Sequence, residues 1–315
     1  MSVDLTIYYG RPGFQMRVRL SQQVSQQCVK EARVSGRKND VSVVVLTKNS
    51  ARTLEKCLVS IERERPFEII AVDGQSTDGT LSILRKHRVK VLSETGEAWG
   101  VGFSRQLGVK TAVSPYVMFV DSDVELSPGC IATLRDNIEI FGWVGVHAML
   151  LLSSEDATYW QWAAEKLDAG GGLHPPGPRA HIGTGVALFR RETLLEHPFD
   201  PRMKYAAEDA DLCLRLRKYG FIVGVTRAYA YHHCRRDFSA VAKQQFSYGI
   251  GDAQLVLKYK SVRIFIRPAL AAVGAIPTMV RARSLELLPY TLITTTIQYF
   301  GMIFGLSKAF RDTIE

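Results

Sequence analysis

Two carboxylates stand one residue apart at the end of an apolar run. Asp121 and Asp123 follow the apolar residues 117–120, which are typical of a buried strand. Two carboxylates that leave the end of one strand together repel each other unless a cation lies between them. Oxygen ligands of this kind suit Mg²⁺ or Mn²⁺, so the pair predicts a divalent metal with a bound phosphate. The alternative is a solvated turn, because Asp and Ser favour turns.

A second group of acids begins a predicted helix much later in the chain. Glu208, Asp209 and Asp211 fall within four residues. The helix dipole favours acids in a first turn, but three acids exceed what capping needs. A carboxylate beside a bound sugar donor acts as a general base on an acceptor hydroxyl. The pair His232 and His233 follows, and one of the two is a candidate metal ligand or phosphate contact.

Further polar residues stand at the ends of predicted strands or on a nearby helix. Thr47, Lys48 and Asn49 end the first strand of the catalytic region and offer donors for a nucleoside or phosphate. Asp73 ends the next strand and can accept from a base N–H or a ribose hydroxyl, while Arg105 can reach a diphosphate. The alternatives are an ordinary strand-to-helix turn, an Asx turn and a solvated helix charge.

The elements that position these residues alternate along the chain. Apolar runs predict strands at residues 41–46, 67–72, 89–92 and 116–120, with helices at 50–64, 80–87 and 102–112. Such alternation indicates crossover units, hence an α/β fold with a parallel sheet. In such sheets ligands gather at the carboxyl ends of strands, where the polar residues stand.

Composition limits the partners and the compartment. The 315 residues are 46% hydrophobic and carry 40 basic against 31 acidic side chains, a net charge of +9. This charge favours an anionic partner, but the basic residues are dispersed, so no nucleic acid is expected. The five cysteines are scattered, which indicates a reduced protein rather than a disulfide framework. The amino terminus contains no apolar run, so no signal peptide is expected.

We divide the chain into an N-terminal extension at residues 1–40, a catalytic domain at 41–258 and a membrane-associated helical region at 259–315. Two uncharged runs, residues 268–280 and 287–306, lie in the last region. The longer run has the length of a transmembrane helix; a buried core helix is the alternative. Basic residues beside the runs favour the anionic cytoplasmic leaflet, so the catalytic domain is expected to face the cytoplasm.

Taken together, the motifs resemble the family 2 glycosyltransferases, which have the GT-A fold. The resemblance implies a Rossmann-like, mostly parallel sheet flanked by helices, which C-terminal amphipathic and hydrophobic helices would follow. The similarity covers roughly residues 41–251. It includes VDGQSTDGT at 72–80, GVGFSRQLGVKTA at 100–112 ahead of VDSD, GTG at 183–185 and EDADL at 208–212. Each motif is weak alone, but their order and spacing make the set specific.

The resemblance implies a role for each matching residue. Asp73 would bind the nucleoside of a nucleotide sugar, Asp121 would contact ribose or metal, and Asp123 would ligate Mn²⁺ or Mg²⁺. His233 stands 24 residues after Asp209, a spacing similar to that of the family's metal-binding histidine. Asp209 would be the catalytic base of an inverting transfer. We expect the acceptor to be bound by Gly183, Thr184, Gly185 and Glu208.

Two departures refine the expectation. Gln106 stands where the family often has Asn, which weakens the assignment of Arg105, and no QxxRW motif follows the base, which argues against a processive polymer synthase. We therefore expect a membrane-associated enzyme that moves one sugar to a lipid-linked saccharide or polyprenyl-type acceptor. GDP-mannose is the favoured donor and a UDP-hexose the alternative. A nucleotidyltransferase and a non-catalytic membrane scaffold are the rival functions.

Overall fold

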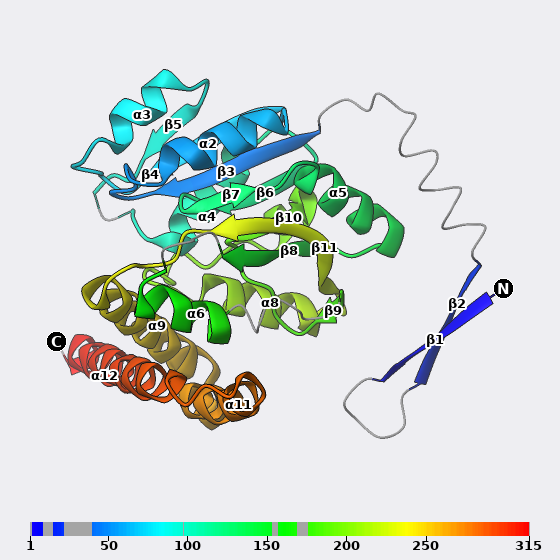
Figure 1. Ribbon diagram of the computed structural model, residues 1–315. Coiled ribbons are helices and arrows are strands. Elements are labelled where there is room, and N and C mark those ends of the chain that lie inside the picture. Colours follow the sequence, from blue (N-terminus) through cyan, green and yellow to red (C-terminus); the bar gives the residue numbers. More distant parts are fainter. Residues whose placement is uncertain are drawn as a thin grey trace. The chain divides into compact units, whose positions relative to one another are not determined.

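The computed structural model describes residues 2–8, 15–21, 40–96, 98–152, 157–168 and 176–314 (Figure 1). The chain divides into two units, Met1–Asn39 and Asp40–Glu315. In the first unit β1 (Ser2–Tyr8) pairs antiparallel with β2 (Gln15–Ser21). The rest of the predicted extension, apart from Asp40, lies outside the described residues.

The second unit contains a nine-stranded sheet in the order β5-β4-β3-β6-β10-β8-β11-β7, with β9 paired to β11. Its strands are β3 (Val41–Thr47), β4 (Glu68–Asp73), β5 (Lys90–Ser93), β6 (Tyr116–Asp121), β7 (Val124–Leu126), β8 (Gly145–Leu152), β9 (Gly177–Arg179), β10 (Val186–Arg190) and β11 (Val223–His232). Strands β5, β4, β3 and β6 are parallel, and the buried apolar runs of β3, β4 and β6 are typical of such strands. Because β10 runs antiparallel to both β6 and β8, the sheet as a whole is mixed rather than mostly parallel.

Helices cover both faces of this sheet (Figure 1). One face packs against α2 (Leu54–Arg63), α3 (Thr80–Lys86) and α5 (Cys130–Phe141). The other face packs against α4 (Val101–Thr111), α7 (Arg191–Glu196) and α8 (Glu208–Lys218). Gly108 brings α4 against β3, because a Cβ there would lie 2.4 Å from Val44. Both α4 and α8 thus begin near the carboxyl ends of the central strands, where the predicted site residues stand.

The remaining helices form a second layer of packing. They are α6 (Tyr159–Asp168), α9 (Phe238–Tyr259), α10 (Val262–Phe265), α11 (Arg267–Ala282) and α12 (Leu287–Ile314). Two glycines let α9 and α12 meet backbone to backbone. A Cβ on Gly249 would lie 2.0 Å from the Gln298 carbonyl oxygen, and one on Gly301 would lie 2.2 Å from that of Phe246. Helix α12 is therefore held against α9 over several turns.

The predicted transmembrane helix was wrong. Residues 287–306 lie in α12, but in the part of the chain that the structure describes no helix has the length and apolar character needed to cross a bilayer. Polar residues interrupt the run and serve packing within the protein. Buried Thr291 and Thr294 donate to the carbonyls of Leu287 and Tyr290, and Gln298 donates to Asp252 of α9 at 2.8 Å.

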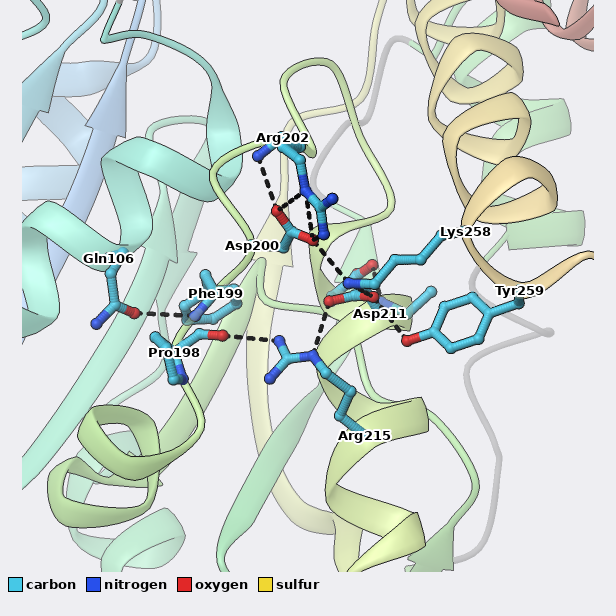
Figure 2. Close-up of polar contacts among 11 residues, drawn as sticks. Gln106, Pro198, Phe199, Asp200, Arg202, Asp211, Arg215, Lys258 and Tyr259 are labelled. Atoms are coloured by element: carbon cyan, nitrogen blue, oxygen red, sulfur yellow. Dashed lines mark hydrogen bonds and ion pairs between the residues drawn. The ribbon is translucent and has the colours of Figure 1, made fainter.

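A cluster of charged side chains ties the end of α9 to α8 (Figure 2). The ammonium of Lys258 lies 2.7 Å from Asp200 and 2.6 Å from Asp211. Asp211 is fully buried, and it also pairs with Arg215 at 2.9 Å and accepts from the Tyr259 hydroxyl at 2.7 Å. The carboxylate of Asp211 is therefore used to hold two helices together rather than offered to a ligand.

Lys258→Met should lower the free energy of unfolding by about 1–2 kcal/mol, because Asp200 and Asp211 lose their shared cation but keep Arg202 and Arg215. Urea denaturation of the full chain measures this loss. Lys56→Met on the exposed side of α2 is the matched control and should change stability by less than about 0.5 kcal/mol. Equal stability of the two variants would show that the cluster contributes nothing.

Candidate active site

The carboxyl ends of the central strands open into a cavity of about 1150 Å³. It is bounded by the ends of β3 and β6, the first turns of α4 and α8, and the amino-terminal half of α9. The predicted site residues that line it are Thr47, Lys48, Asn49, Arg105, Asp121, Asp123, Gly183, Thr184, Gly185, Glu208 and Asp209. Two others lie behind the lining, Asp73 and His233.

Asp73 is buried beneath the loop that follows β4. Its side chain is 1% exposed and accepts from the hydroxyl of Thr47 at 2.8 Å and from the N–H and hydroxyl of Ser76. The amide oxygen of Asn49 accepts from the N–H of Thr77 at 2.9 Å. These bonds join the loops after β3 and β4 into one wall. The carboxylate of Asp73 shapes that wall from behind instead of entering the cavity.

Arg105 links the first acid pair to the second acid group. Its Nη2 lies 3.1 Å from Asp121 and its Nε donates to Glu208 at 2.8 Å, while Thr184 donates to the same Glu208 oxygen. Burial alone would lower the pKa of Arg105, but the charges of Asp121 and Glu208 raise it. Glu208 is thus committed to positioning Arg105. The remaining nitrogen, Nη1, is buried and has no hydrogen-bond partner among the described residues.

Asp123 lies between two cationic side chains. Arg235 Nη1 is 2.5 Å from one carboxylate oxygen, and His232 Nε2 is 3.5 Å from the other. Burial alone would raise the pKa of Asp123, but His232 and Arg235 hold it well below its usual range. Burial would lower the pKa of His232, but its contacts with Asp123 and Cys234 raise it to about 10. A bound cation would have to take the place of that proton.

The structure brings His232, rather than His233, to the acid pair. His232 is the last residue of β11 and lies opposite Val124, and consecutive strand residues point to opposite sides. The ring of His233 therefore turns away and lies 3.6 Å from Glu125. Only the backbone N–H of His233 reaches Asp123, donating to its carbonyl oxygen at 2.8 Å. The choice of His233 from chain spacing missed this alternation.

Asp209 is presented to the cavity at the start of α8, with 23% of its side chain exposed. Its Oδ1 accepts from the N–H of Ala210 at 2.6 Å and lies 3.5 Å from His181 Nε2. Burial alone would raise the pKa of Asp209, but His181 and the Ala210 N–H outweigh it and lower the pKa. A Cβ on Gly183 would lie at ordinary contact distance, 3.7 Å, from Asp209, so Gly183 borders the carboxylate directly.

The donor atoms beside Arg105 and Arg235 fit a hard divalent cation by type. Asp121 and Asp123 supply carboxylate oxygens and His232 supplies an imidazole nitrogen, a set that suits Mn²⁺ or Mg²⁺. Within the described ranges no three His, Cys, Asp or Glu residues form a ready metal cluster. Arg235 and His232 contact the two oxygens of Asp123 instead, so a cation would compete with one of them for this carboxylate.

Residues 42–197 match the family described as Glycosyl transferase family 2. The matched segment contains the strand ends, Arg105, the acid pair and the glycines at 183–185. This segment is a family 2 glycosyltransferase domain. Asp209, His232 and α9 follow the matched segment, but they line the same cavity.

Similar proteins agree with this domain assignment. Over 231 residues the glycosyltransferase chain is 28% identical to an N-acetylglucosaminyl-diphospho-decaprenol L-rhamnosyltransferase of Mycobacterium tuberculosis, a match that covers 61% of this chain and 75% of that protein. It is 35% identical over 92 residues to a poly(ribitol-phosphate) beta-glucosyltransferase of Bacillus spizizenii, covering 26% of this chain and only 14% of the relative. The chain therefore spans a small part of the length of that second relative.

A solved structure shows the fold of the glycosyltransferase domain. The crystal structure of GalNAc-T7 with UDP, GalNAc and Mn²⁺ superposes with a TM-score of 0.51 at 14% sequence identity, covering 69% of this chain and 48% of that chain. At this identity the likeness establishes a GT-A-like architecture alone.

Several cavity residues of the glycosyltransferase were not identified from the sequence. His181 contacts Asp209, His147 lines the cavity nearby, and burial lowers the pKa of His147 to about 4. Arg235 contacts Asp123. Single histidines and arginines carry no spacing signal, and only the tertiary fold brings these three to the acids. Arg235 does lie close in the chain to a candidate residue, three residues after His232 at the end of β11.

Proposed function

We propose that the protein is an inverting, metal-dependent glycosyltransferase that moves one sugar from a nucleotide to a lipid-linked acceptor. The observation that carries the proposal is that Asp209, ionised at neutral pH, shares one cavity with Asp121 and Asp123. A base and a candidate metal–diphosphate site so placed suit the transfer of a sugar between them.

The donor lies on the β3 and β4 side of the cavity in this proposal. The loops that carry Lys48 and Asn49 hold the nucleoside, and Asp121, Asp123 and His232 hold Mn²⁺ or Mg²⁺. When bound, the cation offsets charge on the departing diphosphate. The unpartnered Nη1 of Arg105 is a further donor for a diphosphate oxygen, which supports the role that the sequence suggested for this residue.

Asp209 performs the proton transfer. Its carboxylate takes the proton of an acceptor hydroxyl, whose oxygen then forms a bond to the anomeric carbon of the donor sugar. The bond from that carbon to the diphosphate breaks at the same time, so the configuration inverts. His181, 3.5 Å away, keeps the carboxylate ionised until the proton arrives. Glu208 and Asp211 cannot take over this role without giving up Arg105 and Lys258.

Two observations support a lipid-linked acceptor. One is the relative whose name contains diphospho-decaprenol, and the other is an exposed apolar surface on this protein. The α10–α12 apolar face consists of large, exposed hydrophobic side chains on three consecutive helices and at the joints between them. Its members are Val262, Phe265, Ile266, Leu270, Val273, Ile276, Val280, Leu285, Leu288, Leu292, Phe300, Ile303, Phe304 and Phe310. Exposed apolar side chains gathered on neighbouring helices are a feature of interaction sites.

We assign this face to the surface of an anionic membrane, with the helices lying in the interface. Basic side chains on the same helices, such as Arg263, Arg283 and Lys308, complement anionic head groups. The lipid acceptor then reaches the cavity by diffusing in the membrane plane. The catalytic domain would face the cytoplasm, where nucleotide sugars are available.

Full-length protein should sediment with vesicles of phosphatidylglycerol and phosphatidylcholine, and less with phosphatidylcholine alone. The double variant Leu292→Glu/Phe300→Glu should remain in the supernatant, because it places two charges in the apolar face. Val113→Glu is the matched control, since Val113 is 65% exposed outside this face. Wild-type protein that stays in the supernatant with anionic vesicles would overturn the membrane assignment.

A panel of nucleotide sugars tests the activity itself. Release of nucleoside diphosphate is measured with Mn²⁺, Mg²⁺ or chelator, with and without a bacterial lipid extract. The relatives are named for glucose and rhamnose transfer, so GDP-mannose is one member of the panel beside the UDP-hexoses and nucleotide-linked L-rhamnose. We expect metal-dependent release that the lipid extract stimulates. Absence of release from every donor would contradict the proposal.

A further inference from the structure

The cavity continues beyond the acid residues along one face of α9. Residues Ala240, Lys243, Gln244, Ser247 and Tyr248 line this continuation. Their spacing of three and four residues places them on a single helical face. This part of the cavity belongs to neither the donor loops nor the acid pair, and the proposed reaction has so far given it no role.

The continuation borders the wall that carries Asp209. A Cβ on Gly251 would lie 2.8 Å from the backbone of Ala206, so α9 packs directly on the segment before α8. Tyr248 and Ser247 lie one turn earlier on the same helix. The donor loops after β3 and β4 lie elsewhere on the lining, beyond Asp121. The α9 wall is therefore next to the base on the side that an acceptor would occupy.

Positive charge is concentrated along this wall. Arg235, Arg236, Lys243 and Arg267 all line the cavity. Arg235 is matched by Asp123, and Arg267 by the fully buried Asp252 of α9.

Two of these four cations have no matching acid. Arg236 and Lys243 are exposed and form no ion pair with any residue that the structure describes. The acid beside them, Asp237, caps α9 by accepting from the N–H of Ala240. Asp237 also lines the cavity and keeps its negative charge, but the four cations outnumber the three acids Asp123, Asp237 and Asp252. The wall therefore carries net positive charge inside a cavity, an environment that favours an anionic ligand.

We propose that Arg236 and Lys243, with the Gln244–Tyr248 pair beside them, bind the phosphate or diphosphate group of an isoprenoid-linked acceptor. The inference rests on the proposed function and deepens it by naming an acceptor subsite. The donor diphosphate has Arg105 and the candidate metal ligands, so the acceptor anion needs cations of its own. Arg267 at the start of α11 marks the exit, because the α10–α12 apolar face begins beside it with Phe265, Ile266 and Leu270.

This placement satisfies both ends of such an acceptor. The phosphate group lies against Arg236 and Lys243, the sugar hydroxyl extends toward Asp209, and the isoprenoid chain leaves toward the apolar face. Gln244 donates to the Tyr248 hydroxyl at 3.0 Å, and the two side chains offer further polar contacts without adding negative charge.

Calorimetric binding of farnesyl diphosphate to full-length protein tests the subsite while UDP or GDP with Mn²⁺ saturates the donor site. We expect binding of farnesyl diphosphate but not of farnesol. The double variant Arg236→Gln/Lys243→Gln should weaken farnesyl diphosphate binding by at least about tenfold, because it removes two charge-assisted contacts to the diphosphate. Its nucleotide affinity should not change.

The matched control is Arg227→Gln/Lys56→Gln, which removes two exposed cations from β11 and α2 outside the cavity. It should bind farnesyl diphosphate as the wild type does. Absence of binding by the wild type, equal weakening by both double variants, or a loss of nucleotide affinity in Arg236→Gln/Lys243→Gln would overturn the proposal. Because binding needs no transfer, a protein that binds farnesyl diphosphate but consumes no nucleotide sugar would refute the proposed function and keep the subsite.

Discussion

Asp209→Asn should lower the rate of sugar transfer by about 10²–10⁴-fold, because the amide keeps the size of the carboxylate but cannot accept a proton. Nucleotide affinity should stay near the wild-type value, since Asp209 contacts His181 and the Ala210 N–H rather than the donor loops. Single-turnover transfer and calorimetric nucleotide binding, measured on the same preparation, separate the two effects.

Asp136→Asn provides the control for loss of one aspartate charge, because Asp136 lies on α5 outside the cavity. Its transfer rate should equal that of the wild type. An Asp209→Asn variant that retains most of its activity would contradict the base assignment. The neighbouring acids offer no ready replacement, because Glu208 holds Arg105 and Asp211 holds Lys258.

Asp123→Asn should reduce Mn²⁺-dependent nucleotide affinity by at least about 10²-fold, because a bound cation contributes several kcal/mol of charge stabilisation. The same measurement distinguishes the two histidines. His232→Gln should weaken Mn²⁺-dependent binding strongly, since His232 lies 3.5 Å from Asp123. His233→Gln should leave it nearly unchanged, since that ring faces Glu125.

Calorimetry with UDP and with GDP, each with Mn²⁺ and with chelator, measures these affinities. Thermal unfolding of each variant shows whether the fold is retained. If His233→Gln loses metal-dependent nucleotide binding and His232→Gln keeps it, the assignment of His232 is refuted. His233, the histidine chosen from the sequence, would then be the metal ligand. Unchanged metal-dependent nucleotide binding by Asp123→Asn would refute the proposed metal site.

The strand ends could be predicted from the sequence because their signal is local. The β-branched run of β3 and the apolar run before Asp121 are buried strands, and a polar residue at a strand end needs no tertiary information to be placed there. The parallel pairing of β3 with β4 and β6 then brings these ends to one edge of the sheet. The same local signal gave the acids at the start of α8.

What the sequence could not show depends on partners far along the chain. Asp211 resembles a site acid until Lys258, 47 residues later (258 − 211), pairs with it. Asp73 lies behind the cavity because Thr47 and Ser76 fill its hydrogen bonds. The choice between His232 and His233 needed the strand register.

The end of the chain shows the same limit. The uncharged run in α12 suggested a bilayer crossing, but Gly249 and Gly301 let that helix pack on α9 instead. Its threonines and Gln298 find partners within the protein. Two glycines 52 residues apart (301 − 249) make these close backbone contacts possible. A hydropathy profile of the sequence does not show such contacts.

The most direct test of the central claim is the mass of a polyprenyl-diphosphate-linked saccharide after incubation with the enzyme, Mn²⁺ and the nucleotide sugar that the release assay selects. We predict a gain of one sugar residue, in proportion to the nucleoside diphosphate released, with the anomeric configuration inverted. Nucleoside diphosphate released without any gain in acceptor mass, or a ladder of successive gains, would contradict single-sugar transfer to a lipid-linked acceptor.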